Sequence, residues 1–319
     1  MKGMRTRRKG LLGPPVRDIS IREGMGLGEL TEEMGRSGGF VARKVGEAAD
    51  LLEAMERDGR CLKFLSFPAC IVATGCRGAI RTMVERKMVD VIVTTCGTLD
   101  HDLARSWRSY YHGSFDADDA KLHRAGIHRI GNVFVPVENY GPILEERIQP
   151  ILTELWEGGR RSMSVRELAW ELGRRAGRDS ILWWAWKKKV PVYVPGIFDG
   201  AVGSQLWLFW QNHRDFRLKE FEDQQELADL VFNAKRSGAL MVGGGISKHH
   251  VLWWNQFRGG LDYAVYITTA PEWDGSLSGA RTREAISWGK VRERARHITI
   301  EGDATVLLPL LVGALLDRL

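Results

Sequence analysis

The stretch ALMVGGGISKHHVLWWNQFRGGLDYAVYIT, residues 239–268, decides the fold class. It opens with an apolar run at 239–242, passes three consecutive glycines, continues as a helix from Lys248 and closes with a β-branched and aromatic run at 263–268. A strand, a helix and a second strand of these lengths predict a βαβ unit with two parallel strands. Ligands of such a sheet bind where its strands end.

The same alternation extends outward from this unit. Two helices are expected at 28–34 and 40–55, and a core helix at 306–316. A short apolar run lies at 61–67. Further strands are expected at 89–94, 132–136 and 190–194, and further helices at 77–86, 100–108, 143–156, 165–175, 180–189 and 221–236. We therefore predict an α/β fold with a single doubly wound, mostly parallel, Rossmann-like sheet and extra N-terminal helices. Residues 1–17 are expected to be a flexible basic tail, and 18–319 one domain.

Composition excludes several classes of protein. The 46 basic and 40 acidic side chains give a net charge of only +6, part of which lies within residues 1–9, so we expect no nucleic-acid partner. No apolar run reaches the roughly 18 residues of a membrane span, so we expect no membrane partner. The four cysteines, Cys61, Cys70, Cys76 and Cys96, lack metal-ligand spacing, which favours a cytoplasmic protein and no metal.

Four segments rich in small and polar residues follow predicted strands, at 94–97, 199–203, 243–250 and 274–279. Glycines there let backbone amides approach a pyrophosphate, although the triple glycine lacks the full G-x-G-x-x-G spacing and an ordinary turn is the alternative. His249 suits proton transfer or is a solvated residue at a helix start. Lys290 follows Trp288, whose indole can desolvate an ammonium and favour a nucleophilic amine; a surface lysine is the alternative.

In combination, these motifs resemble the deoxyhypusine synthase family. The resemblance is carried, in order, by Lys248-His249-His250 and by residues 262–267, 272–276, 278–281 and 287–290. It extends backward through Asp199-Gly200, residues 131–140 and 89–95 and, more faintly, Gly38-Gly39-Phe40. It covers nearly everything after residue 18.

The resemblance implies a set of site residues. Lys290 would be the catalytic nucleophile, with His249 as a second catalytic residue. NAD would be held near residues 69–73 and by Thr95, Cys96, Gly97, Asp199, Gly244, Thr269, Ala270, Asp303 and Ala304. Substrate contacts would come from Asp100, His101, His249, Gly275, Ser276, Glu284 and Trp288. His101, Ser204 and Leu277 depart from the acidic groups that the family pattern places at these positions.

The resemblance also implies a reaction and partners. NAD would take hydride from spermidine, Lys290 would carry the aminobutyl group as an imine, and a lysine of the hypusine-bearing translation initiation factor would receive it. The family further implies a homotetramer with sites between subunits.

Three alternatives are considered. One is an enzyme with a different acceptor, and two are proteins of a different class. A homospermidine synthase-like enzyme would use the same chemistry but pass the group to putrescine. A non-catalytic NAD-binding partner subunit is disfavoured by the intact Ser287-Trp288-Gly289-Lys290 motif. A sirtuin-like deacylase would show two cysteine pairs for structural zinc, which are absent from the sequence. The tryptophan pairs at 183–184 and 253–254 are expected to serve packing rather than ligand binding.

Overall fold

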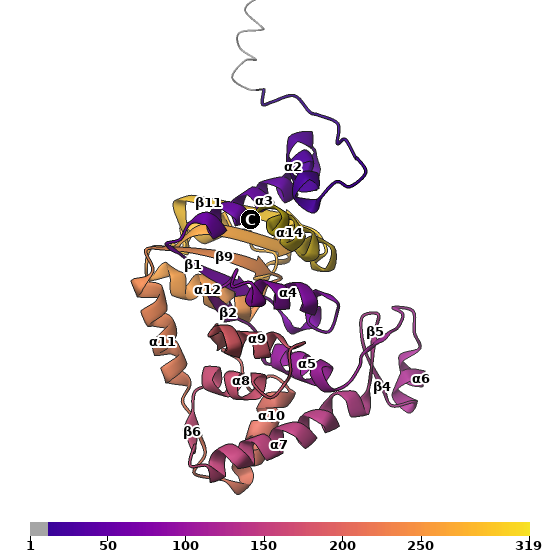
Figure 1. Ribbon diagram of the computed structural model, residues 1–319, viewed down its shortest axis with the longest axis vertical. Helices are drawn as coiled ribbons and strands as arrows, with labels where there is room; N and C mark the ends of the chain where they lie inside the picture. The colour runs from indigo at the N-terminus through magenta and orange to yellow at the C-terminus, as the bar shows by residue number, and fades with distance from the viewer. Residues whose placement is uncertain (1–11) are drawn as a thin grey trace, which may run out of the picture.

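Six parallel strands form the centre of the protein, whose computed structural model describes residues 12–319 (Figure 1). Their order is β11-β10-β9-β1-β2-β7, and every neighbouring pair is parallel. The strands are β1 (Cys61–Ser66), β2 (Val91–Val93), β7 (Val192–Tyr193), β9 (Arg236–Val242), β10 (Leu261–Thr268) and β11 (Val291–Glu301). The chain runs outward from β1 to β7 and then returns beside β1 to form β9. This order confirms the predicted doubly wound parallel sheet.

Helices precede the sheet and connect its strands. The α-helices are α2 (Leu27–Ser37), α3 (Phe40–Arg57), α4 (Cys76–Glu85), α5 (Cys96–Trp107), α6 (Asp119–Arg124), α7 (Gly141–Glu157), α8 (Val165–Gly173), α9 (Ile181–Lys188), α10 (Ala201–Asn212), α11 (Glu220–Asn233), α12 (Ile246–Gln256), α13 (Glu284–Ser287) and α14 (Ala304–Arg318). Short 3-10 helices are η1 (Ala69–Ile71), η2 (Val137–Asn139) and η3 (Glu272–Asp274). The predicted N-terminal helices are thus present as α2 and α3.

Both faces of the sheet are covered, which explains why its inner strands are largely apolar. Successive residues point to opposite faces, so Phe64 and Met241 pack in one core with α11 and α12, whereas Leu65 and Leu240 pack in the other with α3, α4 and α14. Figure 1 shows these two groups of helices on opposite sides of the sheet. The result is a three-layer α/β/α arrangement.

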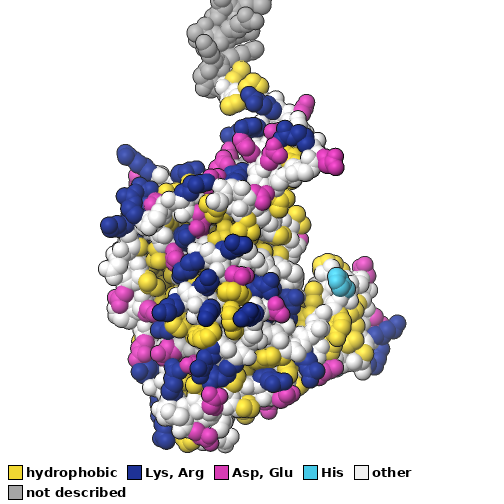
Figure 2. Space-filling view, viewed as in Figure 1, with side chains coloured by type: hydrophobic (Ala, Val, Ile, Leu, Met, Phe, Trp, Pro, Cys, Tyr) yellow, Lys and Arg dark blue, Asp and Glu magenta, His cyan; other side chains and the backbone are white. Residues whose placement is uncertain are grey.

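A small antiparallel sheet projects from this body. It has the order β3-β5-β4 and is formed by β3 (Tyr111–His112), β4 (Ile127–Ile130) and β5 (Val133–Pro136). Figure 2 shows hydrophobic side chains gathered on this projection, while acidic and basic side chains intermingle over much of the rest of this face. A third sheet pairs β6 (Ser162–Met163) with β8 (Arg217–Leu218).

Helix α10 and strand β11 are among the elements that were not expected from the sequence. Helix α10 begins directly after Gly200, inside a segment that we interpreted as a ligand-binding turn. Strand β11 is an edge strand with charged residues in its first half, so its sequence lacks the apolar run of a central strand. Its register shifts between the pairs Leu261↔Val291 and Tyr263↔Arg296, which leaves residues 292–295 in a bulge.

The predicted division into a tail and one domain stays a prediction. Residues 1–11 of the expected tail lie outside the described residues. Within residues 12–319, no helix has both the length and the apolar character needed to cross a bilayer.

Candidate functional site

The residues predicted to bind a cofactor lie beyond the carboxyl ends of the parallel strands. Thr95 follows β2, Asp199 follows β7, Gly244 follows β9, Thr269 follows β10 and Asp303 follows β11. Because the strands are parallel, these ends share one edge of the sheet. The triple glycine stands where the strand order reverses, between β1 and β9, which is where doubly wound sheets bind their ligands.

Two helices point uncapped N-termini toward this edge. Thr95 at the start of α5 and Gly245 at the start of α12 make no side-chain capping bond. Helix α14 differs, because the side chain of Asp303 accepts a hydrogen bond from the backbone N of Thr305 at 2.8 Å. Uncapped N–H groups and the helix dipole favour an anion such as a phosphate. The Cys96 side chain is fully buried, so this residue can offer a ligand only its backbone.

Lys248 anchors the loop that follows β10. Its Nζ donates hydrogen bonds to the carbonyl oxygens of Leu277 at 2.8 Å and Ala280 at 2.6 Å. It also lies 3.6 Å from the ring centroid of Tyr266, whose hydroxyl donates to the carbonyl oxygen of Ser278 at 2.6 Å. Burial lowers the pKa of Lys248 to about 7. This lysine of the Lys-His-His motif therefore holds a loop in place.

The same loop presents Gly275 and Ser276, both predicted substrate contacts and both exposed. The backbone N and Oγ of Ser276 each donate to Oδ1 of Asp274 at 2.7 Å. A Cβ on Gly244 would lie 2.2 Å from Oγ of Ser278, so the loop closes directly over the triple glycine. The two motifs are one structural unit although they are about thirty residues apart.

Lys290 lies among aromatic rings. Its Nζ is 5.2 Å from the ring centroid of Trp288 and 5.7 Å from that of Trp253. The ring of His249 lies 5.8 Å from that of Trp253, with 29° between the planes. Burial lowers the pKa of His249, and the charge of Lys290 lowers it further, so the neutral imidazole can accept a proton near pH 7. Glu284 lies exposed at the start of α13.

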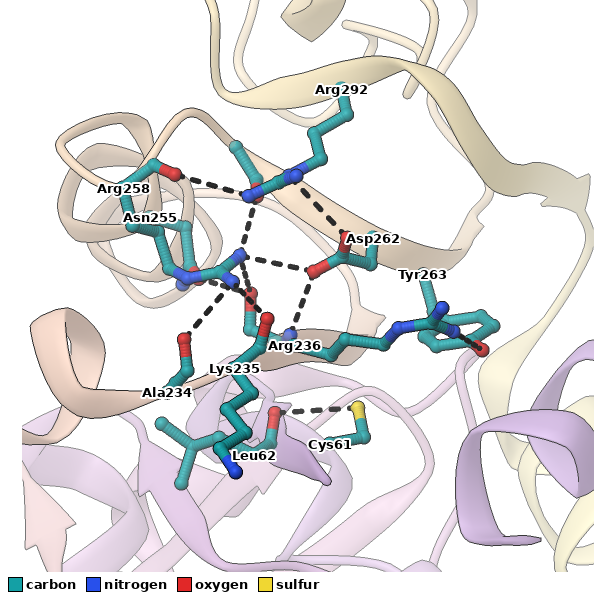
Figure 3. Close-up of polar contacts among 12 residues, drawn as sticks. Cys61, Leu62, Ala234, Lys235, Arg236, Asn255, Arg258, Asp262, Tyr263 and Arg292 are labelled. Carbon is teal, nitrogen blue, oxygen red and sulfur yellow. Dashed lines mark hydrogen bonds and ion pairs between the residues drawn. The ribbon is translucent and has the colours of Figure 1, made fainter. Parts of the chain in front are cut away.

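A network of charged groups joins Arg258, Asp262 and Arg292 near the start of β11 (Figure 3). The carbonyl oxygen of Lys290 accepts a hydrogen bond from the backbone N of Leu261 at 3.0 Å. Beside it, Arg258 donates to Oδ2 of Asp262 at 3.1 Å, and Arg292 donates to the carbonyl oxygen of Arg258 at 3.3 Å. These contacts join the end of α12 to the starts of β10 and β11. The position from which the Lys290 side chain extends is therefore well defined.

Asp100 and His101 lie on α5 and are buried. Oδ2 of Asp100 accepts hydrogen bonds from the backbone N of Ala201 at 2.8 Å and the hydroxyl of Tyr140 at 2.7 Å, while burial raises the pKa of its carboxyl. Nδ1 of His101 lies 2.9 Å from the hydroxyl of Tyr110, and burial lowers the pKa of His101 to about 4. Asp100 thus caps helix α10, and His101 lines a cavity of about 310 Å³.

The structure brings only some of the predicted residues together. Lys290, Trp288 and His249 form one group, and the strand-end residues form another. Asp100 lies with the strand-end group, because Sγ of Cys96 donates to its Oδ1 at 3.8 Å and the backbone N of Ala201, two residues after Asp199, donates to its Oδ2 at 2.8 Å. Asp100 and His101 stay apart from the Lys290 group, because α5 and α12 pack in the cores on opposite faces of the sheet. Lys290 directly precedes β11. Its backbone therefore lies at the amino ends of the parallel strands, whereas the predicted cofactor residues lie beyond their carboxyl ends.

Trp253 lies in the candidate site, although the sequence did not point to it. The pair at 253–254 was expected to serve packing, and Trp254 does pack against the core of α11 and α12. Trp253 instead is 44% exposed beside Lys290. Its spacing of four residues from His249 was the available signal, since such positions share one face of a helix.

Comparison with known proteins agrees with this architecture. The family model for deoxyhypusine synthase matches residues 29–315. A "Probable deoxyhypusine synthase" of Picrophilus torridus is 55% identical over 97% of this chain and 99% of its own, and one of Thermoplasma acidophilum is 51% identical over the same shares. The crystal structure of a "putative deoxyhypusine synthase" from Entamoeba histolytica has the same fold, with a TM-score of 0.66 at 18% identity over 94% of this chain and 96% of that one.

Fold and site geometry place the protein among doubly wound α/β proteins that bind ligands at the carboxyl edge of the sheet. The family match and the close relatives then settle its descent: the chain belongs to the deoxyhypusine synthase family. Membership makes it an aminobutyl-transferring enzyme and confirms the predicted family. The homospermidine-forming alternative is not favoured.

Proposed function

We propose that this enzyme moves the aminobutyl group of spermidine onto a lysine of the hypusine-bearing translation initiation factor, with NAD as cofactor and Lys290 as nucleophile. The observation that carries the proposal is the position of Lys290, whose Nζ lies near the rings of Trp288 and Trp253 with His249 stacked beside them. Aromatic faces suit an alkylammonium substrate, and a neutral imidazole suits proton transfer beside an amine nucleophile.

The strand-end residues fit NAD. The uncapped starts of α5 and α12 offer N–H groups to a pyrophosphate, and Gly245 has open space where a Cβ would stand. Asp199 and Asp303 are exposed at the same edge and could accept hydrogen bonds from ribose hydroxyls. Bound NAD would accept a hydride from the donor and later return it, so that none is consumed.

The residues of this chain would handle the amine chemistry. Once the carbon beside the secondary amine of spermidine is oxidised to an imine, Nζ of Lys290 attacks that carbon and 1,3-diaminopropane leaves with the transferred proton. His249 is placed to accept and return protons during this exchange. The acceptor lysine then displaces Lys290, and reduction of the new imine gives the secondary amine of the product.

The division of the predicted substrate residues supports the homotetramer that the family implies. Asp100 and His101 pack on one side of the sheet, and Lys290 and His249 lie on the other, so a single chain keeps these pairs apart. A second copy could bring its own α5 region against the Lys290 group. A cytoplasmic location fits a translation factor as acceptor and the four free cysteines.

Reductive trapping tests the proposal. Borohydride added during turnover with NAD and spermidine, without acceptor, should fix the aminobutyl mass on Lys290 and leave the buried Lys248 unmodified. Lys290→Ala should abolish transfer, and Lys290→Arg should do the same because a guanidinium stays protonated. Label from spermidine should appear in the initiation factor rather than in putrescine. Full transfer by Lys290→Ala, or trapping at another lysine, would overturn the assignment.

A further inference from the structure

Helix α12 and Phe257, the residue that directly follows it, carry a stripe of three rings, His249, Trp253 and Phe257, which we call the aromatic ridge. Their spacing of four residues places them on one face of the helix. The Trp253 ring lies 5.8 Å from that of His249 and 5.9 Å from that of Phe257, to which it is nearly perpendicular at 89°. Trp253 is therefore held from both sides while 44% of it remains exposed.

The ridge lies beside Nζ of Lys290, which forms no ion pair within the described residues. In the part of the chain that the structure describes, no carboxylate oxygen lies within 4 Å of Nζ of Lys290. On the loop after β10, Oδ1 of Asp274 is occupied by Ser276, and Leu277 offers an exposed apolar side chain. Cations beside Lys290 therefore meet aromatic faces as well as the exposed Glu284, and aromatic faces attract them through the ring quadrupole.

We propose that Trp253 is a positioning and specificity-determining residue of this site. Its indole holds Lys290 beside His249 and, with Trp288, forms an aromatic wall along which the alkylammonium chain of the donor lies. This inference rests on the proposed function, since it assumes that Lys290 is the nucleophile. It goes further by assigning part of the recognition of the amine to a ring on α12 rather than to a carboxylate.

The neighbouring residue offers a matched control. Trp254 makes no cation–π contact with Lys290: its Nε1 donates to Oε1 of Gln224 at 3.1 Å, its ring packs with the core of α11 and α12, and of the ridge it meets Phe257, at 5.7 Å between ring centroids. Removing this indole changes the same helix by the same volume without touching Lys290. A loss of activity caused only by a loosened α12 would therefore appear in both variants.

The experiment compares Trp253→Leu, Trp253→Phe and Trp254→Leu in the full-length enzyme with NAD. Release of 1,3-diaminopropane gives KM and kcat for spermidine, and borohydride trapping gives the fraction of Lys290 modified. Trp253→Leu should raise KM by about 2- to 30-fold, the range of one cation–π contact, and reduce trapping. Trp253→Phe should recover part of the loss because it keeps a ring. Trp254→Leu should lower the melting temperature but leave KM near that of the wild type.

Each outcome decides a separate point. If Lys290 is not trapped in the wild type, the proposed function fails before Trp253 is considered. If the wild type is trapped and Trp253→Leu has an unchanged KM, the inference fails alone. It also fails if phenylalanine is no better than leucine, or if Trp254→Leu raises KM as much. Should the leucine variant not fold, Trp253→Gln replaces it in the comparison with Trp253→Phe.

Discussion

Replacing Asp100 by asparagine tests whether this carboxylate holds the start of α10 or binds the polyamine directly. Its side chain is fully buried and accepts hydrogen bonds from the backbone N of Ala201 and of Val202, both at 2.8 Å, and from the hydroxyl of Tyr140 at 2.7 Å. An asparagine keeps one acceptor oxygen, and its NH₂ group faces a backbone N–H that it cannot satisfy.

The expected cost follows from these contacts. A hydrogen bond to a charged group contributes about 1.5–3 kcal/mol, and a buried donor left unsatisfied costs about 1–3 kcal/mol. An uncharged asparagine also avoids the cost of burying a charge, which is the cost that raises the pKa of Asp100. This saving offsets part of the stability lost with the hydrogen bonds. We therefore expect Asp100→Asn to lower the free energy of unfolding by about 2–4 kcal/mol.

Urea unfolding at one protein concentration, followed by circular dichroism, measures this change. Asp199→Asn is the matched control, because that carboxylate is exposed and its replacement should change stability by less than about 0.5 kcal/mol. A double-mutant cycle with Tyr140→Phe should show coupling, since the two side chains share a hydrogen bond. Unchanged stability of Asp100→Asn together with a raised KM for spermidine would refute the capping role and favour direct binding.

Two further predictions concern the loop after β10. The pKa of Lys248 is lowered to about 7, whereas an unfolded lysine titrates near pKa 10.4, so between these values the unfolded chain binds the extra proton and stability rises with pH. Lys248→Met should flatten this rise between pH 7 and pH 10 in thermal or urea unfolding; a rise as steep as that of the wild type would mean that another group titrates. Gly244→Ala would bring a Cβ to within 2.2 Å of Oγ of Ser278 and force the loop outward. It should cost about 1–3 kcal/mol of stability and weaken NAD binding measured by calorimetry. Gly59→Ala, with open space at its Cβ, is the control, and equal effects of the two would contradict the steric argument.

Local pattern was sufficient for the main features of the fold. Apolar runs near 92, 240 and 265 predicted buried parallel strands, because a strand covered on both faces needs no polar residues. Short motifs of glycine and small polar residues after those strands predicted where a ligand would bind. Strand β11 was not predicted in this way. Its first half is charged because it is an edge strand and contains a bulge.

The sequence by itself determined the family, the α/β fold and the candidacy of Lys290, since each depends on short motifs and on their order along the chain. Only the tertiary structure decided what surrounds them. It placed Trp253 beside Lys290 and buried Asp100 under the start of α10. Trp253 and Lys290 are about 37 residues apart, and Asp100 and Ala201 about 101. Helical and strand periodicity predict only local neighbours, so they cannot predict contacts over such separations. They arise from the way helices pack on the two faces of one sheet, which is a property of the whole chain.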